Sequence, residues 1–298
     1  MLISGCTFIR NGFSLGYPVK ESLASLMELC DEVIVVVGNS DDGTLEYVKS
    51  LQNPNIHIIE TVWDETLRAG GKILAQQTNI GLRACKGDWI VYLQADEVLH
   101  EEDIPRIKKS MEEQISNVAC EGFLFKYIHF FGNYESIGVG RQWYRNEIRV
   151  VRNSKNVESW KDAQGFRINA GNNSYRKLNV IPIDAHIYHY GWVRNPSQHR
   201  LKQNAFQRLY HDDSWLQEHL PKSDEFPSCY ELTHFTGKHP AKMIAKIHAD
   251  AAWTKQFNPN ISTPRPFRVL VCDIVERYTG YRIGEYKNYN ILSASNHE

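Results

Sequence analysis

A strand-type apolar run that ends abruptly in polar and acidic residues constrains this chain most. Residues 89–93 read Trp-Ile-Val-Tyr-Leu, and Gln94, Ala95, Asp96 and Glu97 follow directly. A strand buried on both faces of an α/β sheet needs the first part of this pattern, but nothing in packing requires the second. Ligands of open α/β sheets lie beyond the carboxyl ends of the strands. A simpler interpretation makes Asp96 and Glu97 the cap and first-turn acid of the next helix.

The first 115 residues alternate strand and helix patterns. Strand-type segments end near residue 9 and cover 33–37, 56–59 and 89–93, and helical spacing follows over 19–30, 44–49 and 71–85. This alternation predicts βαβ units and a mostly parallel sheet. We therefore expect an α/β fold with helices that flank the sheet.

Beyond residue 115 the pattern changes. Aromatic or alternating strand patterns at 123–131, 145–152 and 181–190 predict a second, mixed sheet, with basic side chains of 145–152 facing outward. Helical spacing begins at Pro196, and Pro240 opens a last helix. The expected organisation is a domain of residues 1–195, divided into halves at 115 and 116, and a helical C-terminal extension of residues 196–298.

Composition excludes several classes of protein. A formal net charge of −1 argues against nucleic-acid binding, which usually needs a basic excess. No segment approaches the about 18 apolar residues of a membrane span, and no signal-peptide layout is present. Six scattered cysteines without a Cys-x-x-Cys pair indicate free thiols and a cytoplasmic protein.

Polar residues follow the first two strands, where they would be neighbours at one sheet edge. Phe8, Arg10 and Asn11 end the first strand, and the turn from Gly38 to Thr44, which includes Ser40 and Asp42, ends the second. One interpretation is a nucleoside pocket that combines stacking and polar contacts. The other is a turn whose Ser or Asp side chains accept helix N–H bonds.

Three further places carry candidate chemistry. Residues 68–72, Arg-Ala-Gly-Gly-Lys, place Lys72 at a helix start that suits a diphosphate, although a solvated loop would show the same pattern. His186 and His189 point to opposite faces of a strand, so only one of them can reach a metal at Asp96. Asp162 is a carboxylate among aromatic residues, which suits a general base, and turn capping is its alternative.

Familiar motifs of other enzyme classes are absent. The sequence has no Gly-x-Ser-x-Gly, no phosphate-binding P-loop and no metalloprotease helix motif. Gly-x-Gly-x-x-Gly is also missing, which argues against a dinucleotide-dependent oxidoreductase.

Taken together, the chain resembles the family 2 glycosyltransferases, which have the GT-A fold of Rossmann-like nucleotide-diphospho-sugar transferases. Four blocks in the family's order carry this resemblance: residues 8–11, residues 31–44, Asn79 before the turn at 87–89, and residues 93–97. The resemblance makes residues 1–115 the nucleotide-sugar half and residues 116–195 the acceptor half.

The resemblance implies a metal-dependent, inverting transfer of sugar from a nucleoside-diphosphate sugar to a hydroxyl acceptor. Asp96 matches the aspartate that binds Mg²⁺ or Mn²⁺, and His189 is the expected second ligand from the later half. Donor contacts are expected from Phe8, Arg10, Asn11, Gly38, Ser40, Asp42, Lys72, Asn79, Gln94, Ala95 and Asp96. Asp162 is the expected base, with Glu147 and Glu158 as substitutes, and Trp143, Tyr144 and Trp192 are expected to stack on the acceptor.

Two departures from the family pattern leave alternatives open. Gln94 stands where a first aspartate is usual, and Val37-Gly38 stand where an acidic residue usually contacts the nucleoside. The glutamine at position 94 favours one alternative, a catalytically idle protein that binds nucleotide sugars. A nucleotidyltransferase is a second alternative. The expected acceptor is a glycan or a lipid-linked glycan of surface polysaccharide synthesis, reached by peripheral association with the inner face of a membrane.

Overall fold

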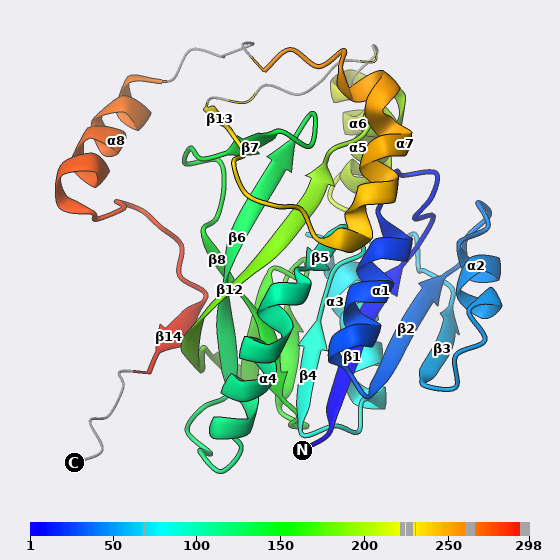
Figure 1. Ribbon diagram of the computed structural model, residues 1–298, viewed down its shortest axis with the longest axis vertical. Coiled ribbons are helices and arrows are strands. Elements are labelled where there is room, and N and C mark those ends of the chain that lie inside the picture. Colours follow the sequence, from blue (N-terminus) through cyan, green and yellow to red (C-terminus); the bar gives the residue numbers. More distant parts are fainter. Residues whose placement is uncertain (68–69, 221–223, 225–228, 230, 260–265, 293–298) are drawn as a thin grey trace.

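Four parallel strands form the N-terminal half of the main sheet (Figure 1). The computed structural model describes residues 1–67, 70–220, 224, 229, 231–259 and 266–292. The strands are β1 (Ile3–Ile9), β2 (Glu32–Gly38), β3 (Ile56–Thr61) and β4 (Trp89–Tyr92), in the spatial order β3-β2-β1-β4. The helices between them are α1 (Val19–Leu29), α2 (Thr44–Ser50) and α3 (Lys72–Ala84). The predicted parallel βαβ units are confirmed.

The apolar runs are continuous because both faces of this half-sheet are covered. Trp89 and Val91 belong to a hydrophobic core that α1 and α4 (Ile104–Glu113) cover. Ile90 and Tyr92, which point the other way, belong to a second core that α3 covers on the opposite face (Figure 1). All four side chains are buried, as expected for a strand inside a two-sided sheet.

The second half of the chain extends the same sheet. β8 (Asn146–Arg152) runs antiparallel to β4, β6 (Gly122–Phe131) antiparallel to β8, and β12 (Leu178–Trp192) parallel to β6. β5 (Glu97–Leu99), which directly follows the β4 turn, pairs antiparallel with β12. The prediction of a separate mixed sheet was therefore wrong, because the distant strands complete the first sheet. β9 (Val157–Trp160), β10 (Gly165–Gly171) and β11 (Ser174–Arg176) form a separate three-stranded sheet, which packs against the second core.

Helices follow the sheet, as expected, but the C-terminal segment also returns to it. Its helices are α5 (Pro196–Gln207), α6 (Asp213–His219), α7 (Ile244–Thr254) and α8 (Phe267–Thr279), the last of which the sequence analysis did not predict. β13 (Leu232–His234) pairs with β7 (Ser136–Gly138), and β14 (Tyr289–Ile291) pairs with β12. None of the helices in the described part of the chain is long and apolar enough to cross a membrane. Cys6, Cys30, Cys85, Cys120 and Cys272 are free thiols.

Candidate active site

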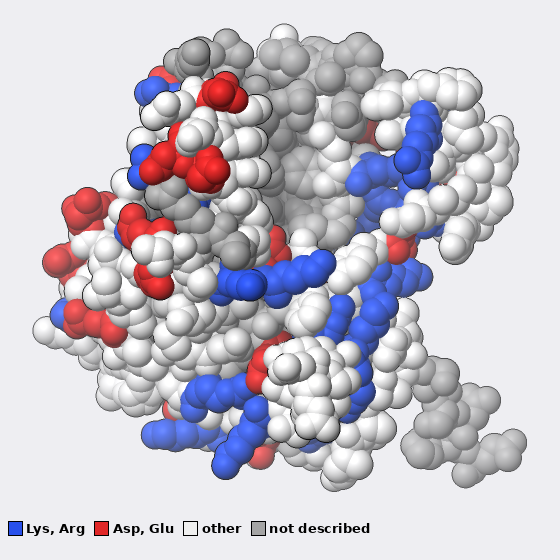
Figure 2. Space-filling model, turned by 180° about the vertical axis from the view of Figure 1, so that it is seen from behind, with Lys and Arg blue, Asp and Glu red and all other residues white. Residues whose placement is uncertain are grey.

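A cleft of about 1280 Å³ opens at the carboxyl ends of β1 and β4. Its walls come from both halves of the sheet, from α5 and from the segment around α8. The cleft brings together these predicted residues: Phe8, Arg10, Asn11, Gln94, Ala95, Asp96, Trp143, Tyr144, Glu147, Asp162 and His189. Figure 2 shows this side of the molecule hollowed, with Lys and Arg side chains gathered beside the hollow.

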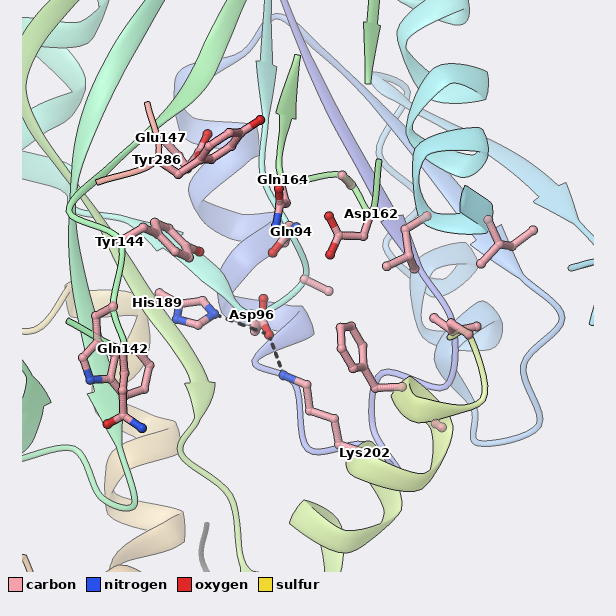
Figure 3. Close-up of a pocket in the computed structure, with 18 of the residues that line it drawn as sticks. Gln94, Asp96, Gln142, Tyr144, Glu147, Asp162, Gln164, His189, Lys202 and Tyr286 are labelled. Atoms are coloured by element: carbon pink, nitrogen blue, oxygen red, sulfur yellow. Dashed lines mark hydrogen bonds and ion pairs between the residues drawn. The ribbon is translucent and has the colours of Figure 1, made fainter. Parts of the chain in front are cut away.

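Asp96 lies on the floor of the cleft beside a lysine (Figure 3). Its Oδ2 atom is 3.2 Å from Nζ of Lys202 on α5, and the same Nζ donates to the carbonyl oxygen of Gly191 at 2.9 Å. Burial opposes ionisation of this carboxyl, but the nearby groups, Lys202 first, together outweigh it and hold the pKa of Asp96 well below its usual range. Asp96 is therefore a carboxylate at every physiological pH.

Strand pairing places His189 beside Asp96. The β5–β12 register pairs His189 with Glu97, and the N–H of Tyr190 donates to the carbonyl oxygen of Asp96 at 2.8 Å. Nε2 of His189 consequently lies 3.8 Å from Oδ2 of Asp96. Burial lowers the pKa of His189 well below its usual value, so the ring is neutral at neutral pH.

A second histidine determines which nitrogen of His189 carries the proton. Nε2 of His129 contacts the carbonyl oxygen of Tyr144 at 2.8 Å, so it must donate there, and Nδ1 of His129 is left as an acceptor. Nδ1 of His189, 2.9 Å away, must therefore donate to it. The lone pair of His189 Nε2 then faces Asp96 and the cleft, as a metal ligand requires.

The chain offers two ligands for a divalent cation at this point, Asp96 and His189. No group of three or more His, Cys, Asp or Glu side chains suited to a metal exists among the described residues. Mg²⁺ in phosphate-handling enzymes commonly takes one or two carboxylates and completes its shell with substrate phosphates and water. The two ligands fit such a cation, provided that a diphosphate supplies further oxygens.

Glu97 does not cap a helix; it is part of the sheet behind the site. Its carboxylate, which is fully buried, accepts two bonds from Arg149 (2.7 and 2.8 Å) and one from the hydroxyl of Tyr127 (2.8 Å). It also accepts the N–H of Gln94 at 3.1 Å, which fixes the turn that presents Asp96. The cap interpretation was wrong, because β5 begins at Glu97 and the next helical turn is capped by His100.

Trp63 forms one end of the cleft, and the sequence analysis missed it. Its ring lies 6.1 Å from the ring of Phe8 and 5.1 Å from the guanidinium of Arg10, centre to centre. A Cβ atom on Gly38 would lie 2.5 Å from Nε1 of Trp63. Trp63 thus fills the space that a larger residue at Gly38 would need, and it offers an aromatic face to a base.

Five predicted donor residues lie outside the cleft lining: Gly38, Ser40, Asp42, Lys72 and Asn79. Asp42 accepts the N–H of Phe13 and of Ser14 at 2.8 Å. Oδ1 of Asn79 accepts the N–H of Ser159 at 2.8 Å.

The contacts of Asp42 hold the loop between β1 and α1, and the contact of Asn79 joins α3 to β9. Ser40 likewise holds Asn11, whose N–H it accepts at 3.0 Å. Lys72 is exposed and lines a separate surface depression with Trp160. Arg68 and Ala69 of the same motif lie outside the described residues.

Asp162 lies on a tight turn that leads into the cleft. Its neighbours Lys161 and Ala163 have positive φ angles of 54° and 62°, a conformation that costs free energy for residues with a side chain. Oδ2 accepts the hydroxyl of Tyr210 at 2.7 Å, and buried Oδ1 has no partner among the described residues. Figure 3 shows the carboxylate pointing into the same cavity as Gln94.

The two substitute bases differ in position. Glu147 lines the cleft, and burial raises its pKa to about 7. Glu158 lies outside the cleft lining, where it accepts bonds from Asn169 and Tyr175. Among the expected stacking residues, Trp143 and Tyr144 line the cleft, whereas Trp192 packs behind it against Trp143.

Comparison with protein families gives one match, which covers more than half of the chain. Residues 18–170 match the model of "Glycosyl transferase family 2". The chain belongs to this family. The resemblance inferred from the sequence is confirmed, and the mixed sheet with flanking helices is the architecture that it implied.

More distant similarities were found among solved structures. TarS from S. aureus is 18% identical, with a TM-score of 0.41 over 69% of this chain and 39% of TarS. TarS 1-349 in complex with UDP and in complex with UDP-GlcNAc are each 22% identical, with TM-scores of 0.34 over 47% of this chain and 38% and 37% of theirs. The chain thus spans less than two fifths of these TarS structures. A comparison with curated proteins finds no match.

The sequence analysis did not identify three residues of the site: Trp63, Arg149 and Lys202. Each is supplied by a segment without a motif and reaches the site only through tertiary structure. Lys202 is one example: Oδ1 of Asn195 accepts the N–H of Gln198 at 2.9 Å and Pro196 follows the cap, so α5 begins where Lys202 can reach Asp96. The sequence shows the helix cap, but it does not show that the helix places Lys202 beside Asp96.

Proposed function

We propose that this protein transfers a sugar from a nucleoside-diphosphate sugar to a hydroxyl group of a glycan or lipid-linked glycan. The observation that carries the proposal is the position of Asp96, an ionised carboxylate at the carboxyl end of β4, with Lys202 and the lone pair of His189 beside it. A family 2 member with this arrangement has the charges needed to hold a diphosphate. The same cleft contains a carboxylate oxygen of Asp162 that has no hydrogen-bond partner among the described residues.

The donor half of the cleft suits the nucleotide. Trp63 and Phe8 offer aromatic surface to the base, and Arg10 and Asn11 offer polar contacts. Lys202 and the buried guanidinium of Arg194 place positive charge around Asp96, where the diphosphate would gather negative charge as it leaves. A Mg²⁺ or Mn²⁺ ion held by Asp96 and His189 would supply further positive charge to the same leaving group.

The acceptor half suits proton removal from a hydroxyl. Inversion requires attack from the side of the sugar opposite the diphosphate, with the acceptor proton taken by a carboxylate there. Asp162 is the proposed base, since Tyr210 orients one of its oxygens and leaves the other without a partner among the described residues. Trp143 and Tyr144 line the cleft with aromatic faces on which an acceptor sugar can stack.

The test is a panel of nucleotide sugars, UDP-linked ones included, with and without Mn²⁺. A donor should raise the melting temperature, because a ligand that binds only the native state stabilises it. The same donor should then be hydrolysed slowly to free sugar and nucleoside diphosphate. Stabilisation by a donor without any hydrolysis or transfer would identify the idle binding protein instead, and no stabilisation by any donor would contradict both functions.

A further inference from the structure

Helix α8 packs with its polar face inward and its apolar face outward. Phe267, Leu270, Val271, Ile274 and Tyr278 recur at helical spacing and share one side of the helix. Phe267 is 81% exposed, Ile274 57% and Tyr278 84%. A surface helix of a globular protein normally turns such a stripe toward the core. Among the residues that the structure describes, the stripe has no apolar partner, which leaves it available to bind another molecule.

Ion pairs hold the helix in this orientation. On its inner side, Asp273 and Glu276 each lie 2.8 Å from the guanidinium of Arg141. Arg282 also contacts Glu276, at 3.6 Å, and Arg141 donates to the carbonyl oxygen of Cys272 at 2.8 Å. Rolling the apolar stripe inward would break all of these contacts, so the outward orientation belongs to the folded protein.

The charge exposed around the stripe is basic. Arg268 and Arg277 are exposed on α8, whereas both acidic residues of the helix face the body of the protein. Tyr281, 67% exposed, and Ile283, 44% exposed, extend the apolar surface beyond the helix. This lobe is visible in Figure 2, where blue side chains lie beside white ones.

We propose that α8 and Tyr281, the α8 face, bind the head-group region of an anionic lipid bilayer. A helix that presents Phe, Tyr and aliphatic side chains with flanking arginines has the composition of an interfacial membrane-binding helix. Charge complementarity favours a bilayer over a second copy of the chain. In a dimer formed through two α8 faces, Arg268 and Arg277 of both copies would lie close together. Neither face carries an acidic side chain that could pair with them, so these charges would repel one another.

The α8 face also borders the cleft. Val269 and Cys272 line the cleft from the other side of the helix, and Arg268, which also borders the cleft, lies between that side and the stripe. A chain bound through α8 therefore holds the cleft beside the lipid head groups. If the proposed function is right, this position gives the cleft access to a lipid-linked acceptor, but binding of the α8 face to lipid does not depend on that function.

Sedimentation with vesicles tests the proposal without any sugar donor. The full chain should bind vesicles of phosphatidylcholine mixed with phosphatidylglycerol, and should bind phosphatidylcholine alone more weakly. The triple variant Phe267→Ser/Ile274→Ser/Tyr278→Ser should bind the mixed vesicles at least about tenfold more weakly than the wild type, because it removes most of the outward apolar surface. Arg277→Gln should reduce the preference for the anionic vesicles.

A matched control removes equally exposed apolar residues from elsewhere. Val62 and Val118 are 82% and 84% exposed, and Val62→Ser/Val118→Ser should bind vesicles like the wild type. The triple variant should keep the melting temperature of the wild type, which shows that the chain is folded. Equal vesicle binding by wild type and triple variant would overturn the proposal. So would a wild type that binds no vesicles and forms a dimer that the triple variant lacks.

Discussion

The carboxylate of Asp96 and the ammonium of Lys202 form an ion pair, 3.2 Å apart, at the point where we propose that a divalent cation binds. With Arg194 nearby and Gln94 neutral, the groups around Asp96 have a net positive charge before any metal or donor binds. This charge favours a diphosphate and disfavours a free divalent cation. We therefore expect metal and nucleotide to bind together, since the diphosphate brings the negative charge that the missing aspartate would have supplied.

Replacing Lys202 should change metal binding and nucleotide binding in opposite directions. Lys202→Gln removes a positive charge beside Asp96, so Mn²⁺ should bind to the nucleotide-free protein at least about tenfold more tightly. A nucleoside diphosphate without metal should bind more weakly. Calorimetry with Mn²⁺ alone and with nucleotide alone measures both. Lys126→Gln, which removes a surface lysine paired with Asp184, should change neither.

His129 should matter to the metal although it does not face Asp96. Its acceptor nitrogen fixes the proton of His189 on Nδ1, which leaves Nε2 free as a ligand. His129→Phe removes that acceptor and should weaken Mn²⁺ binding in the presence of nucleotide about 10- to 100-fold. Binding of nucleotide without metal should stay the same. An unchanged Mn²⁺ affinity would show that the histidine pair only packs the sheet.

The N-terminal half of the fold was predictable because its signals are local. Continuous runs such as Trp89–Leu93 predict strands covered on both faces, and the structure places alternate residues in two cores. The second half was predicted as strands but assigned to another sheet. Which strand pairs with which is a tertiary property, and nothing in residues 178–192 indicates that β12 lies beside β6.

The same limit applies to the site. Asp96 was readable from the end of a strand, and His189 from its strand position, but their 3.8 Å contact depends on the β5–β12 register. Arg149 was expected to face outward with the other basic residues of its strand. That expectation was wrong: Arg149 is buried against Glu97, because a bidentate carboxylate compensates its charge inside the protein.

Removing Glu97 should destabilise the protein strongly. Glu97→Gln leaves the guanidinium of Arg149 buried without its counter-charge, and breaking such a pair costs about 3–5 kcal/mol. Urea denaturation should show a lower unfolding free energy by that amount. Glu113→Gln breaks the exposed pair with Lys109 and should cost less than about 0.5 kcal/mol, as exposed helix pairs do. Similar costs for the two variants would contradict the structural role assigned to Glu97.

Glu147 should make stability depend on pH. Burial raises its pKa from 4.5 to about 7, so the folded protein binds this proton more tightly than the unfolded chain does. The stabilisation is fully present below pH 4.5 and is lost as the pH rises through 7, a change of about 3 kcal/mol. The unfolding free energy of wild type relative to Glu147→Gln should fall by that order over this range. The buried histidines change the unfolding free energy with pH in the opposite direction. Their contribution is the same in both proteins and cancels in the comparison.

Asp162 and Glu147 can be separated as bases by kinetics. Asp162→Asn removes the carboxylate that Tyr210 orients, and it should lower kcat for transfer about 10²- to 10⁴-fold while donor affinity stays nearly intact. Glu147→Gln is the matched change on the other wall of the cleft and should retain most of the activity. Wild-type turnover in Asp162→Asn together with a large loss in Glu147→Gln would transfer the role to Glu147. That outcome would also predict a rate that rises with pH near 7, where the carboxyl of Glu147 loses its proton.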